Sequence, residues 1–280
     1  MKKYTDIDIH YLHKDRLFGD DPSGPHNLCR ILDGPHGKLF STCFMAGGEG
    51  LHPTVVFCHG YPGNEENMDV AHALQRVGFH VMTFHYSGSW GSGGDFSLQH
   101  CIDDTQFVID TVKNNAEYQA DPADIFLFGQ SMGGFVVSHV TAARTDIRAA
   151  VAAVPADFGQ MEKLSHQSEQ AREGFLSGLK EGDGWLAGTS IEKMQQECRL
   201  FADDRCFTDL VGTQDLPMLI IGAEYDTLVS AEEIVEPWAR RLQELYGKKT
   251  EYVCLPTDHM LSDMRCRLTE MAAEFFCRQI

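Results

Sequence analysis

Short apolar runs rich in β-branched residues alternate with amphipathic stretches of helical length from about residue 37 to the end of the chain. Residues 54–60, 79–86 and 125–128 are three of these runs, each followed by a turn rich in Gly, Pro or Asn. Strands that alternate with helices in this way form a parallel sheet covered by helices on both faces. The pattern therefore predicts an α/β fold with a mostly parallel central sheet flanked by helices.

The boundaries of single elements follow from turn and capping residues. Apolar positions at spacing three predict a helix over residues 65–78, with Asn64 as its N-cap. A last helix is expected over about residues 262–277. The chain before residue 37 is expected to add one or two antiparallel edge strands.

The interval from residue 156 to 215 breaks the alternation. It lacks a long β-branched run, and its apolar residues fall at roughly helical spacing. We therefore expect a core domain made of residues 1–155 and 216–280, interrupted by a helical insertion over residues 156–215.

The charge and hydropathy of the chain exclude several classes of function. With 41 acidic against 23 basic residues, the formal net charge is -18, and no cluster of Lys and Arg stands out. A nucleic-acid partner is therefore not expected. No run of about 18 apolar residues occurs, and no apolar segment follows the two N-terminal lysines. The sequence predicts a cytoplasmic protein without a membrane partner.

Cysteine and histidine patterns indicate neither disulfides nor a metal. The nine cysteines are odd in number, widely spread and form no CxxC pair, which is typical of reduced thiols. Among the 13 histidines, His10 and His13 are three apart, but no further ligand candidates lie beside them at zinc-site spacing. We expect no metal and no cofactor.

The segment GQSMGG, residues 129–134, lies between a predicted strand and a predicted helix. A GxSxG sequence at such a junction forms a sharp turn that exposes the serine above the sheet. Gly129 and Gly133 have a steric reason to be there, because a tight elbow leaves no room for Cβ atoms. Ser131 is therefore the predicted nucleophile, with glycine-rich packing as the structural alternative.

A serine nucleophile needs a base and an orienting carboxylate. In the fold where GxSxG joins a strand to a helix, these residues follow the serine along the chain as Asp or Glu and then His. His259 is the single histidine after Asp226, so it is the predicted base. Asp226 is the predicted orienter, with Glu224 in reserve. Asp258 is expected to make only local hydrogen bonds.

Two backbone amides should stabilise the oxyanion of the tetrahedral intermediate. Met132 follows the nucleophile, and Tyr61 lies in the loop HGYPGN after the strand at residues 54–60. Both amides are predicted donors, whereas His59 is expected to pin the loop. The glycine-rich loop that contains Trp90 and Asp95 matches no nucleotide-binding motif and is expected to shape or brace the edge of the site.

The segments HGYPGNEEN, YSGSWGSGGDFS, GQSMGG, GAEYDTLV and TDH, in this order, resemble the α/β-hydrolase superfamily. Within it, the sequence is most similar to bacterial feruloyl or cinnamoyl esterases and to the prolyl-oligopeptidase-like (S9) group. The resemblance covers residues 37–280 and implies the α/β-hydrolase fold and the roles given above for Ser131, His259, Asp226, Tyr61 and Met132. It also implies that the helical insertion is a cap over the active site. The 280 residues contain no segment like the large N-terminal propeller of full-length S9 peptidases, so selection of oligopeptides by such a propeller is not expected.

These features predict a serine hydrolase that cleaves carboxylic esters (EC 3.1.1), with short-chain or hydroxycinnamoyl acyl groups. A peptidase or amidase acting on small peptides, a thioesterase and an inactive binding protein remain as alternatives. From the apolar content of the insertion, Phe175, Trp185 and Leu186 are expected to form one wall of the acyl pocket. The expected partner is a small ester substrate. The oligomeric state is left open, with a homodimer as one option.

Overall fold

A computed structural model describes residue 4 and residues 6–280, so residues 1–3 and 5 of the predicted core domain lie outside the described part. Its centre is an eight-stranded sheet in the order β1-β2-β4-β3-β5-β6-β7-β8. The strands are β1 (His26–Asp33), β2 (Lys38–Met45), β3 (His52–Cys58), β4 (His80–Phe84), β5 (Ala120–Gln130), β6 (Ala149–Ala153), β7 (Met218–Ala223) and β8 (Thr250–Leu255). Strand β2 is antiparallel to both β1 and β4, and the pairings from β4 to β8 are parallel. The predicted mostly parallel sheet is confirmed.

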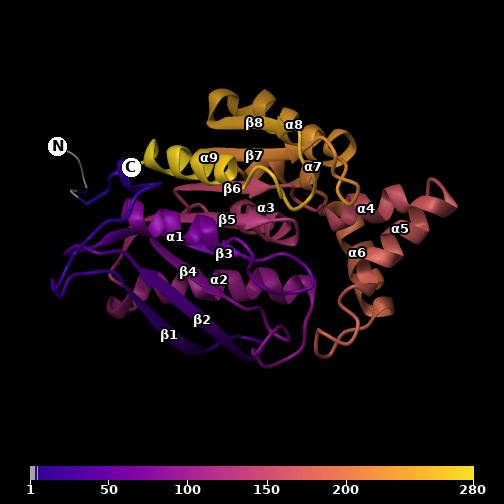
Figure 1. The fold of residues 1–280 in the computed structure, drawn as a ribbon. Coiled ribbons are helices and arrows are strands. Elements are labelled where there is room, and N and C mark those ends of the chain that lie inside the picture. Colours follow the sequence, from indigo (N-terminus) through magenta and orange to yellow (C-terminus); the bar gives the residue numbers. More distant parts are fainter. Residues whose placement is uncertain (1–3, 5) are drawn as a thin grey trace.

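Helices cover both faces of this sheet (Figure 1). Helices α1 and α9 pack together on one face, and α2, α3 and α8 lie on the other. The α-helices are α1 (Met68–Val77), α2 (Leu98–Asn114), α3 (Met132–Ala143), α4 (Phe158–Ser165), α5 (Glu169–Lys180), α6 (Ile191–Asp204), α7 (Phe207–Leu210), α8 (Glu236–Tyr246) and α9 (Arg265–Cys277).

The hydrophobic core consists of two layers, one on each face of the sheet. Every residue of β3, β4, β6 and β7 is buried. A strand buried on both faces reads as a continuous apolar run, which is why these segments were visible in the sequence. Since the helices cover the faces, the carboxyl ends of the parallel strands are left to build a site.

Two element boundaries differ from the expectation. Helix α1 begins at Met68, so Asn67 occupies the capping position and Asn64 is exposed. The carboxylate of Glu65 accepts hydrogen bonds from the backbone and side-chain nitrogens of Asn67, which fixes a non-helical turn before the helix. Helix α9 begins at Arg265, three residues later than expected. The described residues before residue 37 contain one antiparallel edge strand, β1, which agrees with the one or two expected.

The segment between β6 and β7 contains α4, α5, α6 and α7, and no strand is found in this described segment. In Figure 1 helices α4, α5 and α6 project from one end of the sheet. One set of contacts joins the two ends of this segment to each other, and another attaches the segment to the core. Asp157, which is 3% exposed, accepts hydrogen bonds from Gln160 N at the start of α4 and from Phe207 N at the start of α7. His139 of α3 lies within hydrogen-bond distance of Arg205 O, at the end of α6.

Across the part of the chain that the structure describes, no helix is long and apolar enough to cross a membrane. All nine cysteines are free thiols, and five of them are buried. Burial raises the pKa of all five buried thiols, and that of Cys206 rises to about 11. These thiols therefore stay protonated near neutral pH.

Candidate active site

Ser131 occupies the sharp turn between β5 and α3. Its backbone has φ 56° and ψ -120°, a conformation that is strained for a residue with a side chain. A Cβ added at Gly129 would lie 2.2 Å from Gly133 O, and one added at Gly133 would lie 1.8 Å from Cys58 O. The two flanking glycines are therefore required for the turn, as the sequence predicted. Ser131 N donates to Ala153 O over 2.9 Å, which ties the turn to β6.

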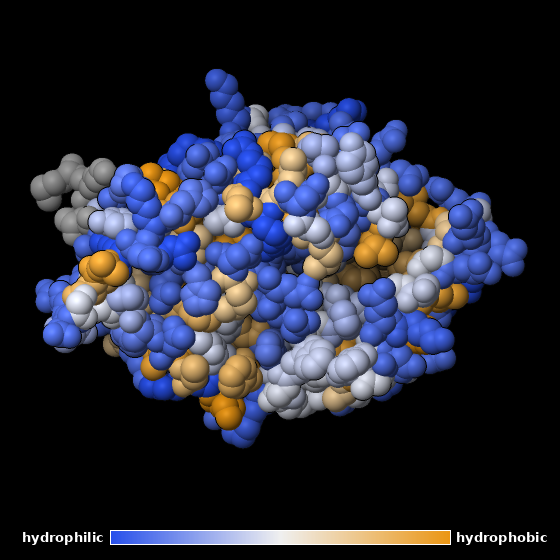
Figure 2. Space-filling view, in the orientation of Figure 1, coloured by the Kyte–Doolittle hydropathy of each residue, from blue (hydrophilic) through white to orange (hydrophobic). Residues whose placement is uncertain are grey.

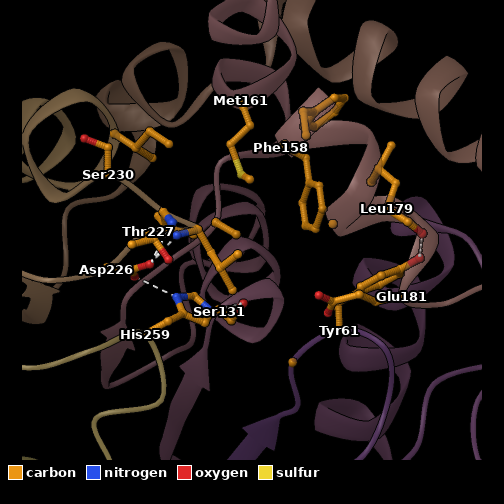
Figure 3. A pocket seen from close by; sticks show the side chains of 18 of the residues that line it. Tyr61, Ser131, Phe158, Met161, Leu179, Glu181, Asp226, Thr227, Ser230 and His259 are labelled. Carbon is orange, nitrogen blue, oxygen red and sulfur yellow. Dashed lines mark hydrogen bonds and ion pairs between the residues drawn. The ribbon is translucent and has the colours of Figure 1, made fainter. Parts of the chain in front are cut away.

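Ser131, His259 and Asp226 form one hydrogen-bonded chain (Figure 3). Ser131 Oγ lies 2.9 Å from His259 Nε2, and His259 Nδ1 lies 2.6 Å from Asp226 Oδ2. Asp226 Oδ1 accepts two more bonds, from the backbone amides of Leu228 and Val229, each over 2.8 Å. Because the carboxylate fixes Nδ1 as the donor, Nε2 is left to accept the serine proton.

The other residues weighed for these roles lie elsewhere. Glu224 is exposed, and its backbone amide pairs with Leu255 O. Asp258 accepts a hydrogen bond from Ser262 N over 2.9 Å, the local contact expected of it. Three further histidines, His85, His100 and His139, each face a backbone carbonyl group.

The loop at residues 59–64 lies beside Ser131. A Cβ added at Gly60 would be 3.6 Å from Ser131 Cβ. His59 is fully buried, faces Gly60 O with Nδ1 and accepts a bond from Tyr86 N with Nε2. Burial lowers the pKa of His59 to about 3, so the imidazole is neutral and pins the loop. Met132 is fully buried at the first position of α3, next to Ser131.

The side chain of Tyr61 turns from this loop toward the cap helices. Its hydroxyl donates to Leu179 O of α5 over 2.5 Å, as Figure 3 shows. Burial raises the pKa of this hydroxyl to about 12, so it remains a donor at neutral pH. Tyr61 therefore links the loop beside Ser131 to the helical insertion.

A cavity of about 670 Å³ opens above Ser131. One wall is α4 and α5, and the opposite wall is the segment from Thr227 to Ile234. Figure 2 shows a hollow with apolar walls on the side of the molecule where the cap helices lie. The apolar lining consists of Ala156, Phe158, Met161, Leu164, Ala171, Phe175, Leu179, Leu228, Val229, Ile234 and Met260.

Of the three residues expected in the pocket wall, only Phe175 lines this cavity. The expectation for Trp185 and Leu186 is wrong, because both follow the end of α5, beyond the wall. Trp185 is 60% exposed and stacks on Trp90 with ring centroids 5.1 Å apart. Leu186 is buried instead beside Gly63 and Gly182. Trp90 therefore braces its loop against the cap.

Most residues of the cavity wall were not predicted from the sequence. Phe158, Met161 and Leu164 recur at spacing three, so their shared helix face was visible, but its direction was not. Gly174 and Gly178 also line the cavity, and a Cβ added at either would meet nothing within 4 Å. In the described part of the chain, no group of three or more His, Cys, Asp or Glu side chains could hold a metal ion.

Comparison with known proteins gives one family. The family model described as serine aminopeptidase, S33 (Hydrolase_4) matches residues 51–206. The uncharacterized protein YfhR of Escherichia coli K12 is 25% identical over 191 residues, which are 66% of this chain and 65% of YfhR.

Two solved structures are similar over most of the chain. The esterase Pf2001 of Pyrococcus furiosus is 19% identical with a TM-score of 0.66, covering 91% of this chain and 90% of Pf2001. Est1E of Butyrivibrio proteoclasticus, solved with ferulic acid bound, is 20% identical with a TM-score of 0.68, covering 89% and 98%. At these identities the likeness shows a shared fold.

Proposed function

We propose that this chain, which belongs to the α/β-hydrolase family described as serine aminopeptidase, S33, is a carboxylesterase (EC 3.1.1). The proposed reaction passes through an acyl-enzyme. The main support is the hydrogen-bonded chain from Ser131 Oγ through His259 to Asp226, at the floor of an apolar cavity. This arrangement pairs a nucleophile with a base and the base with an orienter.

In the acylation step, Ser131 Oγ attacks the ester carbonyl carbon while its proton passes to His259 Nε2. The carbonyl oxygen becomes an oxyanion, which accepts hydrogen bonds from the backbone amides of Met132 and Tyr61. The tetrahedral intermediate then collapses, the bond to the alcohol oxygen breaks, and His259 gives its proton to the leaving alcohol.

In the deacylation step, a water molecule gives a proton to His259 Nε2 and attacks the acyl-enzyme carbonyl carbon. The second tetrahedral intermediate collapses, the carboxylic acid leaves and the proton returns to Ser131 Oγ. Asp226 stays ionised throughout, because it orients the imidazole and stabilises its protonated form.

The cavity lining favours a neutral, apolar acyl group of moderate size. Its charged side chains other than the Asp226–His259 pair are Glu66, Glu181 and Glu233, and no Lys or Arg of the described chain lines it. An anionic substrate such as a coenzyme A thioester would be repelled, so the thioesterase reading is weaker. The ferulic acid bound to the similar fold of Est1E supports an aromatic acid as one candidate acyl group.

Hydrolysis of aminoacyl amides is the second candidate function. The description of the family names an aminopeptidase, and the cavity carries carboxylates that could attract an amine. The same three side chains would serve, with His259 protonating an amine in place of an alcohol.

The test is a panel of p-nitrophenyl esters from acetate to octanoate, methyl ferulate, and aminoacyl p-nitroanilides. We expect turnover of the esters, and Ser131→Ala should lower kcat by about 10³-fold or more. A fluorophosphonate probe should label Ser131 in the wild type only. Preference for the anilides over matched esters would favour the second candidate, and full activity of Ser131→Ala would exclude both.

A further inference from the structure

Arg265, the first residue of α9, uses all of its hydrogen-bonding capacity. A guanidinium has five N–H donors, and those of Arg265 make five bonds. Two go to the Asp69 carboxylate over 2.9 and 2.6 Å, and one goes to Asn67 Oδ1 over 2.9 Å. The other two go to Gln130 Oε1 and to Met260 O, each over 3.3 Å.

The acceptors come from the three segments that surround the proposed nucleophile. Asn67 and Asp69 end the loop that carries Tyr61 and begin α1. Gln130 directly precedes Ser131, and Met260 directly follows His259. One guanidinium, 24% exposed, therefore joins the nucleophile turn, the base loop and the loop beside them.

Gln130 extends this network to His259. Its side chain is buried, with 4% of the residue exposed, and its Nε2 donates to His259 O over 3.2 Å. The amide can satisfy both partners in one orientation only, since Oε1 must face Arg265 and Nε2 must face the carbonyl. Gln130 thus ties the backbone of the base to the strand that carries the nucleophile.

Asn67 extends the network in the opposite direction. It is 2% exposed, accepts from Arg265 with Oδ1, and donates from Nδ2 to Glu65 Oε1 over 2.7 Å. A continuous series of side-chain hydrogen bonds therefore runs from Glu65 through Asn67, Arg265 and Gln130 to His259 O. Charge-assisted bonds of this kind fix geometry as well as adding energy.

From this network we propose that Arg265 and Gln130 are positioning residues, which hold the His259 loop and the 59–67 loop against Ser131. The inference rests on the esterase function proposed above. Neither side chain has to touch the reacting atoms: each acts through the backbone of a segment that does. A displacement of about 1 Å in such a segment can cost about 100-fold in rate.

The experiment compares Gln130→Met with Gln130→Glu on p-nitrophenyl butyrate. Met is of similar length and removes both bonds. Glu keeps an acceptor for Arg265, and hence the tie that supports folding, but it places a second carboxylate oxygen opposite His259 O. We expect kcat to fall by about 10- to 100-fold in both variants, with KM within about threefold of wild type, because the apolar walls formed by α4, α5 and residues 227–234 are unchanged. The Tm of Gln130→Glu should stay near that of wild type.

Arg267→Met is the control variant, on α9, the helix that also carries Arg265. Arg267 is 53% exposed and makes a single contact, to Glu270 over 3.5 Å, so its loss should leave kcat unchanged. A kcat within twofold of wild type for Gln130→Met would overturn the positioning role while leaving the esterase function intact. Absence of ester turnover by the wild-type protein would instead overturn the proposed function, and the positioning role with it.

Discussion

At the scale of single residues, Glu65 makes the stability of the fold depend on pH. Its Oε2 is buried without a hydrogen-bond partner, whereas Oε1 accepts two bonds from Asn67. Burial raises the pKa of Glu65 from 4.5 to about 7. Between these values the folded state holds a proton that the unfolded state has released. The contribution of Glu65 to the free energy of unfolding therefore falls as pH rises through this window.

We predict that Glu65→Gln removes this loss. The amide oxygen of Gln can still accept from Asn67, and no charge has to be buried. The Tm of the variant should match that of wild type at pH 5 and exceed it at pH 8, by the equivalent of about 1 to 2 kcal/mol, since the residue keeps some solvent contact. Thermal unfolding followed by circular dichroism from pH 5 to 8 measures this. Parallel Tm curves for the two proteins would contradict the account.

At the scale of elements, α5 determines how much room the cavity offers. Its positions 171, 174 and 178 are Ala, Gly and Gly, and all three line the cavity. Glycine inside a helix costs about 1 kcal/mol relative to alanine. Here the absence of side chains leaves open space between α5 and the opposite wall.

We predict that Gly178→Leu shortens the acyl chain that the enzyme accepts. The new side chain meets nothing within 4 Å of its Cβ, so it extends into the cavity without a clash at its base. The value of kcat/KM should fall at least about 10-fold for p-nitrophenyl octanoate, the equivalent of excluding one or two methylenes, and stay near wild type for the acetate. A chain-length series of p-nitrophenyl esters measures the shift.

Trp185→Ala is the companion to this variant. Trp185 packs on Trp90 outside the cavity, so its removal should leave the chain-length profile unchanged. Two results would show that the acyl group does not bind in the cavity beside α5. One is a change of the chain-length preference in Trp185→Ala, and the other is an unchanged preference in Gly178→Leu.

At the scale of the whole molecule, charge is expected to select the substrate. The formal net charge is -18, and carboxylates of Glu66, Glu181 and Glu233 line the cavity. A field of one sign focused at a cleft repels ligands of the same sign, and added salt weakens it.

We predict a salt-dependent preference for neutral esters. At low salt, kcat/KM for p-nitrophenyl hexanoate should exceed that for the p-nitrophenyl monoester of adipic acid, which has the same chain length and a terminal carboxylate, by at least about 10-fold. The ratio should shrink between about 10 mM and 1 M NaCl, as the screening length falls from about 30 to 3 Å. Glu181→Gln should reduce the ratio, and Glu173→Gln, outside the cavity lining, should not. A ratio independent of salt would contradict the prediction.

Local sequence patterns are enough to predict the sheet and the backbone turn at Ser131. Strands buried on both faces are mostly apolar along their whole length, so β3, β4, β6 and β7 could be recognised as short runs rich in apolar residues. The elbow likewise follows from local sterics, because Gly129 and Gly133 are needed wherever such a turn is made. Chain order then selected Asp226 and His259, which the fold brings within hydrogen-bond distance of one another.

The surroundings of these side chains depend on how distant segments pack together. Helical periodicity predicts that Phe175, Trp185 and Leu186 belong to an apolar region, but it does not give the direction in which each points. Phe175 lies on α5 and lines the cavity, whereas Trp185 lies in the turn after α5 and stacks on Trp90. The contact between Arg265 and Gln130 joins residues 135 positions apart. No local propensity encodes such a pair, because it exists only once α9, α1 and the end of β5 have packed together.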